Sequence, residues 1–149
     1  MHLALWLFPT VYKYISETGD MAFLDEVIPF ADKEEGTVYE HLKRAVDFSM
    51  NHLGVHGMPA GLYADWNDCL RLGKAGESSF VAMQFYYAMT ILKKFAEYKG
   101  DTDYIAYLEE KQKQQGDVIN EFCWNEDRFI RGFTEAGETI GKRTDNEAN

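Results

Sequence analysis

The sequence predicts an all-α fold, and three observations support that prediction. Several long segments carry apolar residues at the spacing of a helix face, capping residues precede them, and glycine follows them. With 46% hydrophobic and 27% charged residues, the chain of 149 residues has an ordinary globular composition and is long enough to bury a core. We therefore expect long helices near residues 3–18, 37–53, 79–99 and 102–121.

The first predicted helix ends before Gly19-Asp20, and the third ends before Gly100-Asp101. In both pairs the glycine would end one helix and the aspartate would cap the next. An offset of 81 residues (100 minus 19) fits repeated helix pairs, which stack as solenoids or close into toroids, although coincidence explains it equally well. Pro9 interrupts the first helix and either kinks it or marks its true first turn.

The second predicted helix has the clearest boundaries. Thr37 and Glu40 form a capping box at its start, and Gly54 stands where a left-handed C-cap residue belongs. The third helix, 79–99, is apolar around much of its circumference, so we expect it to be deeply buried.

A strand signal follows the fourth helix. Residues 128–134 alternate polar and apolar side chains, and a turn at 135–138 separates them from Thr139-Ile140. This pattern predicts a short C-terminal β-hairpin, and it is the only strand signal that we find in the sequence.

Charge and cysteine content narrow the possible partners and the compartment. The formal net charge of −10 repels phosphate backbones and anionic lipids, so we expect neither nucleic acid nor a membrane surface as a partner. Cys69 and Cys123 lack metal-type spacing, and the first residues resemble no secretory leader, so a reducing cytoplasm fits best. We expect no bound metal.

A glycine-rich segment, 54–63, leads into Asp65-Trp66-Asn67-Asp68. Loops on a rigid helical scaffold often carry binding and catalytic residues. An indole offers a flat apolar face to a sugar ring, while carboxylates and amides pair with its hydroxyls. Taken alone, the pattern is also explained if an aspartate caps a short helical turn and Trp66 anchors the core.

Five blocks in order carry a family resemblance. The chain resembles the inverting glycoside phosphorylases, cellobiose phosphorylase and its relatives, along nearly its whole length. The blocks are YKYI and ETGD within 12–20, FLDEV at 23–27, TVYEHLKRA at 37–45, ADWNDCL at 64–70 and GES at 76–78. Several spaced blocks in the right order are more specific than a single short motif.

The resemblance implies an (α/α)6 toroid that converts cellobiose and inorganic phosphate to α-glucose 1-phosphate and glucose. It assigns Asp68 as the general acid and Trp66 to the donor-sugar subsite. Phosphate attacks as an anion and needs no base, so one acid suffices, and Asp65 would act by binding substrate and by raising the pKa of Asp68. Phosphate is then a co-substrate, no cofactor is implied, and a homodimer is expected of the full-length enzyme.

The family members are several times longer than this chain. We therefore expect residues 1–149 to form an incomplete arc of the toroid, a part of the catalytic domain truncated at both ends and inactive alone. Two alternatives remain open. One is a helical-toroid glycoside hydrolase in which Asp65 or Glu77 serves as the base for water, and the other is a non-catalytic helical repeat module that binds a partner.

Overall fold

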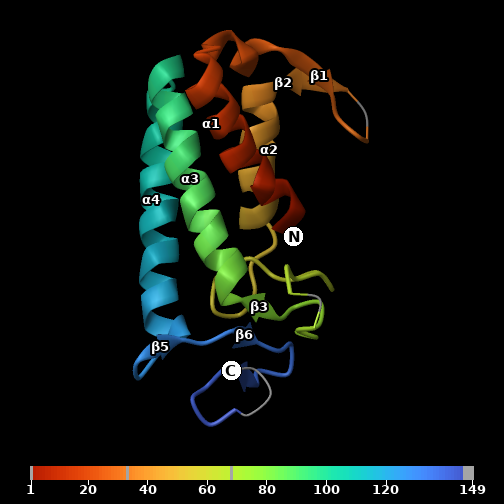
Figure 1. The fold of residues 1–149 in the computed structure, drawn as a ribbon, viewed down its shortest axis with the longest axis vertical. Helices are drawn as coiled ribbons and strands as arrows, with labels where there is room; N and C mark the ends of the chain where they lie inside the picture. Colours follow the sequence, from red (N-terminus) through yellow and green to blue (C-terminus); the bar gives the residue numbers. More distant parts are fainter. Residues whose placement is uncertain (1, 33, 68, 146–149) are drawn as a thin grey trace.

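The computed structural model describes residues 2–32, 34–67 and 69–145. Its long helices stand side by side and alternate in direction along the chain, as Figure 1 shows. They are α1 (Leu7–Thr18), α2 (Val38–Met50), α3 (Ser79–Lys99) and α4 (Thr102–Val118). Helix α3 contacts each of the others, so it is the central element, and the prediction of a mainly helical fold is confirmed.

The first predicted helix is divided in two. A 3-10 helix, η1 (His2–Trp6), precedes α1, so Pro9 lies in the first turn of the α-helix, where its missing N–H costs nothing. Gly19 ends α1 with a φ of 73°, as its position predicted. Asp20 then caps a second 3-10 helix, η2 (Met21–Asp25), by accepting a hydrogen bond from the Phe23 N–H at 3.3 Å.

The second predicted helix begins as expected but ends early. The capping box between Thr37 and Glu40 is present, with both reciprocal hydrogen bonds. The helix stops at Met50, and Asn51 caps it in a right-handed conformation, so the assignment of Gly54 as the C-cap was wrong. Gly54 has a different role, because a Cβ there would lie 2.5 Å from the Glu77 carboxyl carbon.

The third and fourth helices match their predicted starts. Ser78 caps α3, and Gly100 ends it with a φ of 69°. Asp101 caps α4 by accepting a hydrogen bond from the Tyr104 N–H at 3.4 Å. A glycine that ends one helix and an aspartate that caps the next are therefore present at both predicted places. The predicted end of the fourth helix is replaced by a π-helical turn, η3 (Ile119–Cys123). None of the helices in the described residues is long and apolar enough to cross a membrane.

Short antiparallel strands close both ends of the bundle. At one end, β1 (Val27–Pro29) pairs with β2 (Glu35–Thr37). At the other end, β3 (Glu77–Ser78), β6 (Gly132–Phe133) and β7 (Thr139–Ile140) form a sheet in the order β3-β6-β7. A separate pair is formed by β4 (Trp124–Asn125) and β5 (Arg128–Phe129). The expectation of a single strand signal was therefore wrong, because β1, β2, β3 and β4 all lie outside residues 128–140.

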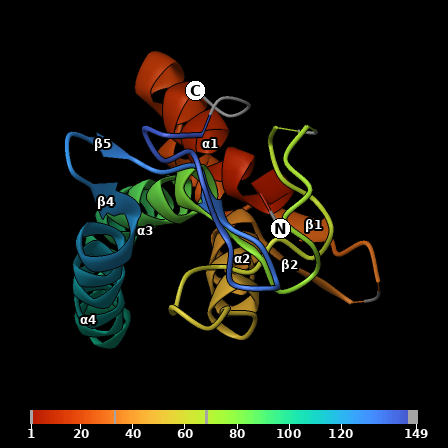
Figure 2. The same ribbon diagram turned by 90° about the horizontal axis from the view of Figure 1, so that it is seen from below.

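Two apolar clusters hold these elements together. The larger cluster lies among the helices and includes Phe8, Leu42, Phe85 and Leu92, each no more than 1% exposed. The smaller cluster, around Met58, Ala82 and Ile130, joins the lower end of α3 to η3 and to the C-terminal strands. Figure 2 shows this end from below, where the C-terminal strands cross under the helices beside the loop that precedes β3.

Candidate active site

The predicted functional segment lies in a loop at the end of the bundle that carries β3 (Figure 1). We call residues 62–74 the active loop. Its base is a short ladder, in which the Gly61 N–H donates to the Gly76 carbonyl at 2.7 Å and the Leu62 N–H to the Lys74 carbonyl at 2.9 Å. An isolated β-bridge between Ala60 and Glu77 continues the ladder toward α3. The base of the active loop is therefore fixed by backbone hydrogen bonds.

Asp65 is buried at the start of the loop tip, with 7% of its surface exposed. Its Oδ2 accepts a hydrogen bond from the Asn67 N–H at 3.0 Å, which closes a local turn. Its Oδ1 is buried and has no hydrogen-bond partner among the residues that the structure describes. A buried acceptor of this kind is suited to receive a hydroxyl from a ligand.

Trp66 is exposed over 57% of its surface, so it does not anchor the core. Its indole lies against the ring of Phe80, on the first turn of α3, with the ring centroids 5.2 Å apart and the planes inclined by 34°. More than half of the surface of Trp66 thus remains accessible beside this contact. This placement leaves an apolar surface of the kind that sugar rings contact.

Asp68, the predicted general acid, lies outside the described residues. Its neighbours are described on both sides: the Asn67 Oδ1 accepts a hydrogen bond from the Cys69 N–H at 3.1 Å. Asp65 and Asn67 thus each accept, through a side-chain oxygen, a hydrogen bond from the backbone N–H two residues later. The alternative in which an aspartate caps a short helical turn is not met at Asp65, because the described residues that follow it form a bend and no helix, and Asp65 accepts from the N–H only two residues later.

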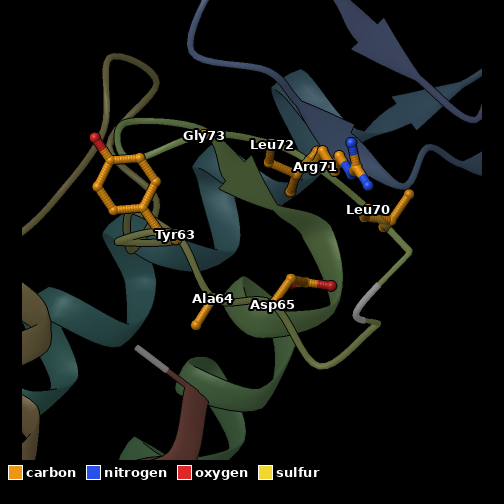
Figure 3. A pocket seen from close by; sticks show the side chains of 8 residues that line it. Tyr63, Ala64, Asp65, Leu70, Arg71, Leu72 and Gly73 are labelled. Carbon is orange, nitrogen blue, oxygen red and sulfur yellow. The ribbon is translucent and has the colours of Figure 1, made fainter.

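Two pockets flank the active loop, and both include Asp65 and Leu70. The first has a volume of about 410 Å³ and lies between the two arms of the loop. Figure 3 shows Asp65 on one arm and Arg71 on the other, with Tyr63 on the far side of the pocket from Arg71. The second, of about 340 Å³, is lined by Trp66, Phe80 and Phe129, and by polar groups of the loop and of β5. Both volumes are in the range of small-ligand sites.

Glu77, the candidate base of a hydrolase, is committed to a different set of contacts. Its carboxylate is 1% exposed and accepts hydrogen bonds from the backbone N–H groups of His56 and Met58, each at 3.1 Å. The Nδ1 of His56 contacts the same carboxylate. The His56 ring packs against Phe133, with centroids 4.0 Å apart. The Glu77 carboxylate therefore binds the backbone of the glycine-rich segment that precedes the active loop.

Sequence reasoning missed several residues that line the pockets. Phe80 lies on the helix that we expected to be deeply buried, yet 43% of its surface is exposed beside Trp66. Arg71 and Phe129 were given no role in the site. No local pattern identifies them, because they approach Asp65 and Trp66 only when the loop and the C-terminal strands are folded.

Residues 2–149 match the Glycosyl hydrolase 94 superfamily, catalytic domain. The chain belongs to this family. The match covers the whole helical bundle and the active loop, and the recognition of the chain as part of the catalytic domain in an inverting glycoside phosphorylase family is confirmed.

The curated relatives of this Glycosyl hydrolase 94 superfamily member include several phosphorylases. An N,N'-diacetylchitobiose phosphorylase of Vibrio proteolyticus is 40% identical over 139 residues, which cover 92% of this chain and 17% of the relative. A solabiose phosphorylase of Paenibacillus borealis is 34% identical over 149 residues, covering 97% of this chain and 19% of the relative. The chain thus spans less than a fifth of the length of these relatives.

Proposed function

We propose that this chain is part of the catalytic domain of an inverting disaccharide phosphorylase. In that enzyme Asp68 is the general acid, Trp66 forms a wall of the donor-sugar subsite, and Asp65 binds substrate. The observation that supports this most directly is the active loop itself, which places buried Asp65 and exposed Trp66 on the same pocket. We also propose that this chain forms an arc of an (α/α)6 toroid.

The chemistry needs one acid. A phosphate oxygen forms a bond to C1 of the donor sugar from the face opposite the leaving group, and the bond between C1 and the glycosidic oxygen breaks. Asp68 transfers its proton to that oxygen, so the second sugar leaves as a neutral alcohol. Attack from the opposite face inverts the anomeric centre and yields an α-sugar 1-phosphate from a β-linked disaccharide.

A hydrolase would need a second carboxylate to activate water. Glu77 is a poor candidate, because both of its oxygens already accept hydrogen bonds from the segment 56–58 and its side chain is 1% exposed. Of the two candidates in the described residues, Asp65 is the carboxylate that a hydrolase could use. The hydrogen bond that it accepts from the Asn67 N–H is equally consistent with a role in shaping the active loop.

The proposal also concerns which disaccharide the enzyme cleaves. Resemblance favoured cellobiose, whereas the relatives described above are named for N,N'-diacetylchitobiose and for solabiose. We therefore propose a disaccharide of this general class, with cellobiose and N,N'-diacetylchitobiose as the first substrates to compare. Inorganic phosphate is the proposed co-substrate, and we expect no resident cofactor, a cytoplasmic location, and a homodimer of the complete enzyme.

The decisive experiment uses a complete enzyme that contains this chain. Each disaccharide is incubated with and without inorganic phosphate, and the products are separated and identified. We expect cleavage to require phosphate and to release an α-sugar 1-phosphate. Cleavage without phosphate, giving two free sugars, would establish the hydrolase instead, and binding without cleavage of any disaccharide would favour a non-catalytic module. The chain alone is expected to be inactive, because it spans 17% to 19% of these relatives.

A further inference from the structure

Two carboxylates that lie outside the active loop bind its surroundings, one the segment 56–58 that precedes the loop and the other the returning arm at Lys74. Glu77 follows the loop on β3, and Glu135 lies in the turn between β6 and β7. Neither carboxylate has a place in the proposed proton transfer. Their hydrogen bonds nevertheless fix the segments from which Asp65 and its neighbours project.

Glu77 holds the segment that enters the loop. Its buried carboxylate accepts from the backbone of His56 and Met58, as described above, and so gathers the N–H groups of that segment. Gln115 holds the same segment from the other side, because its Nε2 donates to the Gly57 carbonyl at 2.6 Å. A charged acceptor forms stronger hydrogen bonds than a neutral one, and a buried one resists replacement by water. The glycine-rich entry is therefore rigidly placed.

Glu135 holds the segment that leaves the loop. Its Oε2 accepts from the Lys74 N–H at 2.9 Å, and its own N–H donates to the Leu72 carbonyl at 2.7 Å. The returning arm is thereby tied to the C-terminal sheet. Unlike Glu77, Glu135 is an exposed residue, so its carboxylate can be removed without opening the core.

The backbone between the residues that Glu77 and Glu135 bind is strained, and their hydrogen bonds help to maintain that strained conformation. Leu62 and Tyr63 are consecutive non-glycine residues with φ values of 52° and 64°, in the left-handed region. Residues held there cost on the order of 1 kcal/mol or more each and persist only when their surroundings enforce them. The hydrogen bonds at the base of the active loop must therefore maintain these two φ values. Glu77 and Glu135 both lie near this base.

We propose that Glu77 and Glu135 are positioning residues, which hold the segment before the active loop and the returning arm of the loop so that Asp65 meets the substrate in the productive geometry. This inference rests on the proposed function for its catalytic consequence. It assigns both carboxylates an indirect effect on the reaction, through the backbone of the loop, and no proton transfer.

The first test measures the loop directly, in a complete enzyme that contains this chain. Hydrogen exchange is followed at the amides of Gly61, Leu62 and Lys74 in Glu135→Ala and in the wild type. We expect at least tenfold faster exchange at Lys74, whose N–H loses its acceptor, and faster exchange along the ladder. The control is Glu138→Ala, an exposed carboxylate on the same turn, which should leave these rates unchanged. Unchanged rates in Glu135→Ala would overturn the proposal.

The second test measures catalysis in a complete enzyme that contains this chain. In Glu135→Ala and Glu77→Gln we expect kcat per folded molecule to fall about tenfold to a hundredfold, the usual effect of a small misplacement of reacting groups. The shape of the pH profile should stay the same, and Glu77→Gln, which keeps one acceptor oxygen, should retain more activity than Glu77→Ala.

Thr37→Ala is the stability control, because it removes a cap at the far end of the bundle and should leave kcat unchanged. Loss of one limb of the pH profile in Glu77→Gln would show direct proton transfer and overturn the proposal. So would wild-type kcat in folded Glu135→Ala. If the wild-type enzyme produces no sugar phosphate, the proposed function fails separately, and the exchange rates still decide whether these carboxylates hold the loop.

Discussion

At the residue scale, the buried Oδ1 of Asp65 is the most informative atom of the site, because it lacks a hydrogen-bond partner among the described residues. We expect Asp65→Asn to lower kcat/KM about tenfold, since an amide keeps the size of the side chain and one acceptor but loses the charge-assisted bond to a ligand hydroxyl. Steady-state kinetics with the complete enzyme measure this. A loss as large as that of Asp68→Asn would show that Asp65 takes part in proton transfer.

Asp68 is tested by the dependence of the rate on the leaving group. Asp68→Asn removes the transferable proton, so phosphorolysis of an ordinary disaccharide should fall by about 10²–10⁴, the usual share of general acid catalysis. A substrate whose leaving group departs as a stable anion needs little protonation and should be largely spared. Equal losses for good and poor leaving groups would mean that Asp68 binds or shapes the site, and the assignment would have to be abandoned.

At the element scale, α2 and α4 are joined through Asp101, the residue that caps α4. Its Oδ2 accepts hydrogen bonds from the Lys43 Nζ at 2.9 Å and from the Tyr39 hydroxyl at 3.1 Å. The hydrogen bond from Lys43 lowers the pKa of the Asp101 carboxyl below its usual value, against the opposing effect of burial. A lowered pKa means that folding favours the charged form, so this contribution is present above about pH 4 and is lost as the pH falls through the folded pKa.

Asp101→Asn tests this junction, because asparagine is also a good cap and only the charge is removed. We expect the free energy of unfolding to fall by about 1 kcal/mol at pH 7, because water screens this partly exposed ion pair, and by much less at pH 3. Urea denaturation at both pH values measures the difference. Asp103→Asn, an exposed carboxylate in the first turn of the same helix, is the control. An equal loss at both pH values would show that charge is not the cause.

The elements differ in how well the sequence predicted them. The capping box of Thr37 with Glu40 and the glycines after α1 and α3 depend on residues within a few positions, so their local patterns were sufficient. The pairing of β1 with β2 was missed, because it links strands of only three residues without a buried face. The contacts of Glu77, an open candidate for a hydrolase base, could not be foreseen from the sequence, because its partners lie 19 and 21 residues earlier in the chain.

At the scale of the whole molecule, several large apolar side chains are exposed on the outer faces of the helices. On η1 and α1, Trp6, Leu7 and Tyr14 are each more than 40% exposed, and Tyr87 on α3 is 50% exposed. Helical repeats normally bury such faces against neighbouring helices or protect them with polar caps. We expect the isolated chain to self-associate, which sedimentation or size-exclusion analysis over a range of concentrations measures. A monodisperse monomer with a sharp cooperative melt would argue that the chain is not an arc of a larger toroid.

The contact between Glu135 and Lys74 also sets an order of assembly. It joins residues 61 positions apart, and α3 and α4 lie between them. Contacts between residues distant in the chain form slowly, because closing a long loop costs entropy before the contact is made. We expect the helices to fold first and the active loop to become ordered only when the C-terminal strands dock. During synthesis, the loop that carries Asp65 would then leave the ribosome long before its own geometry is established.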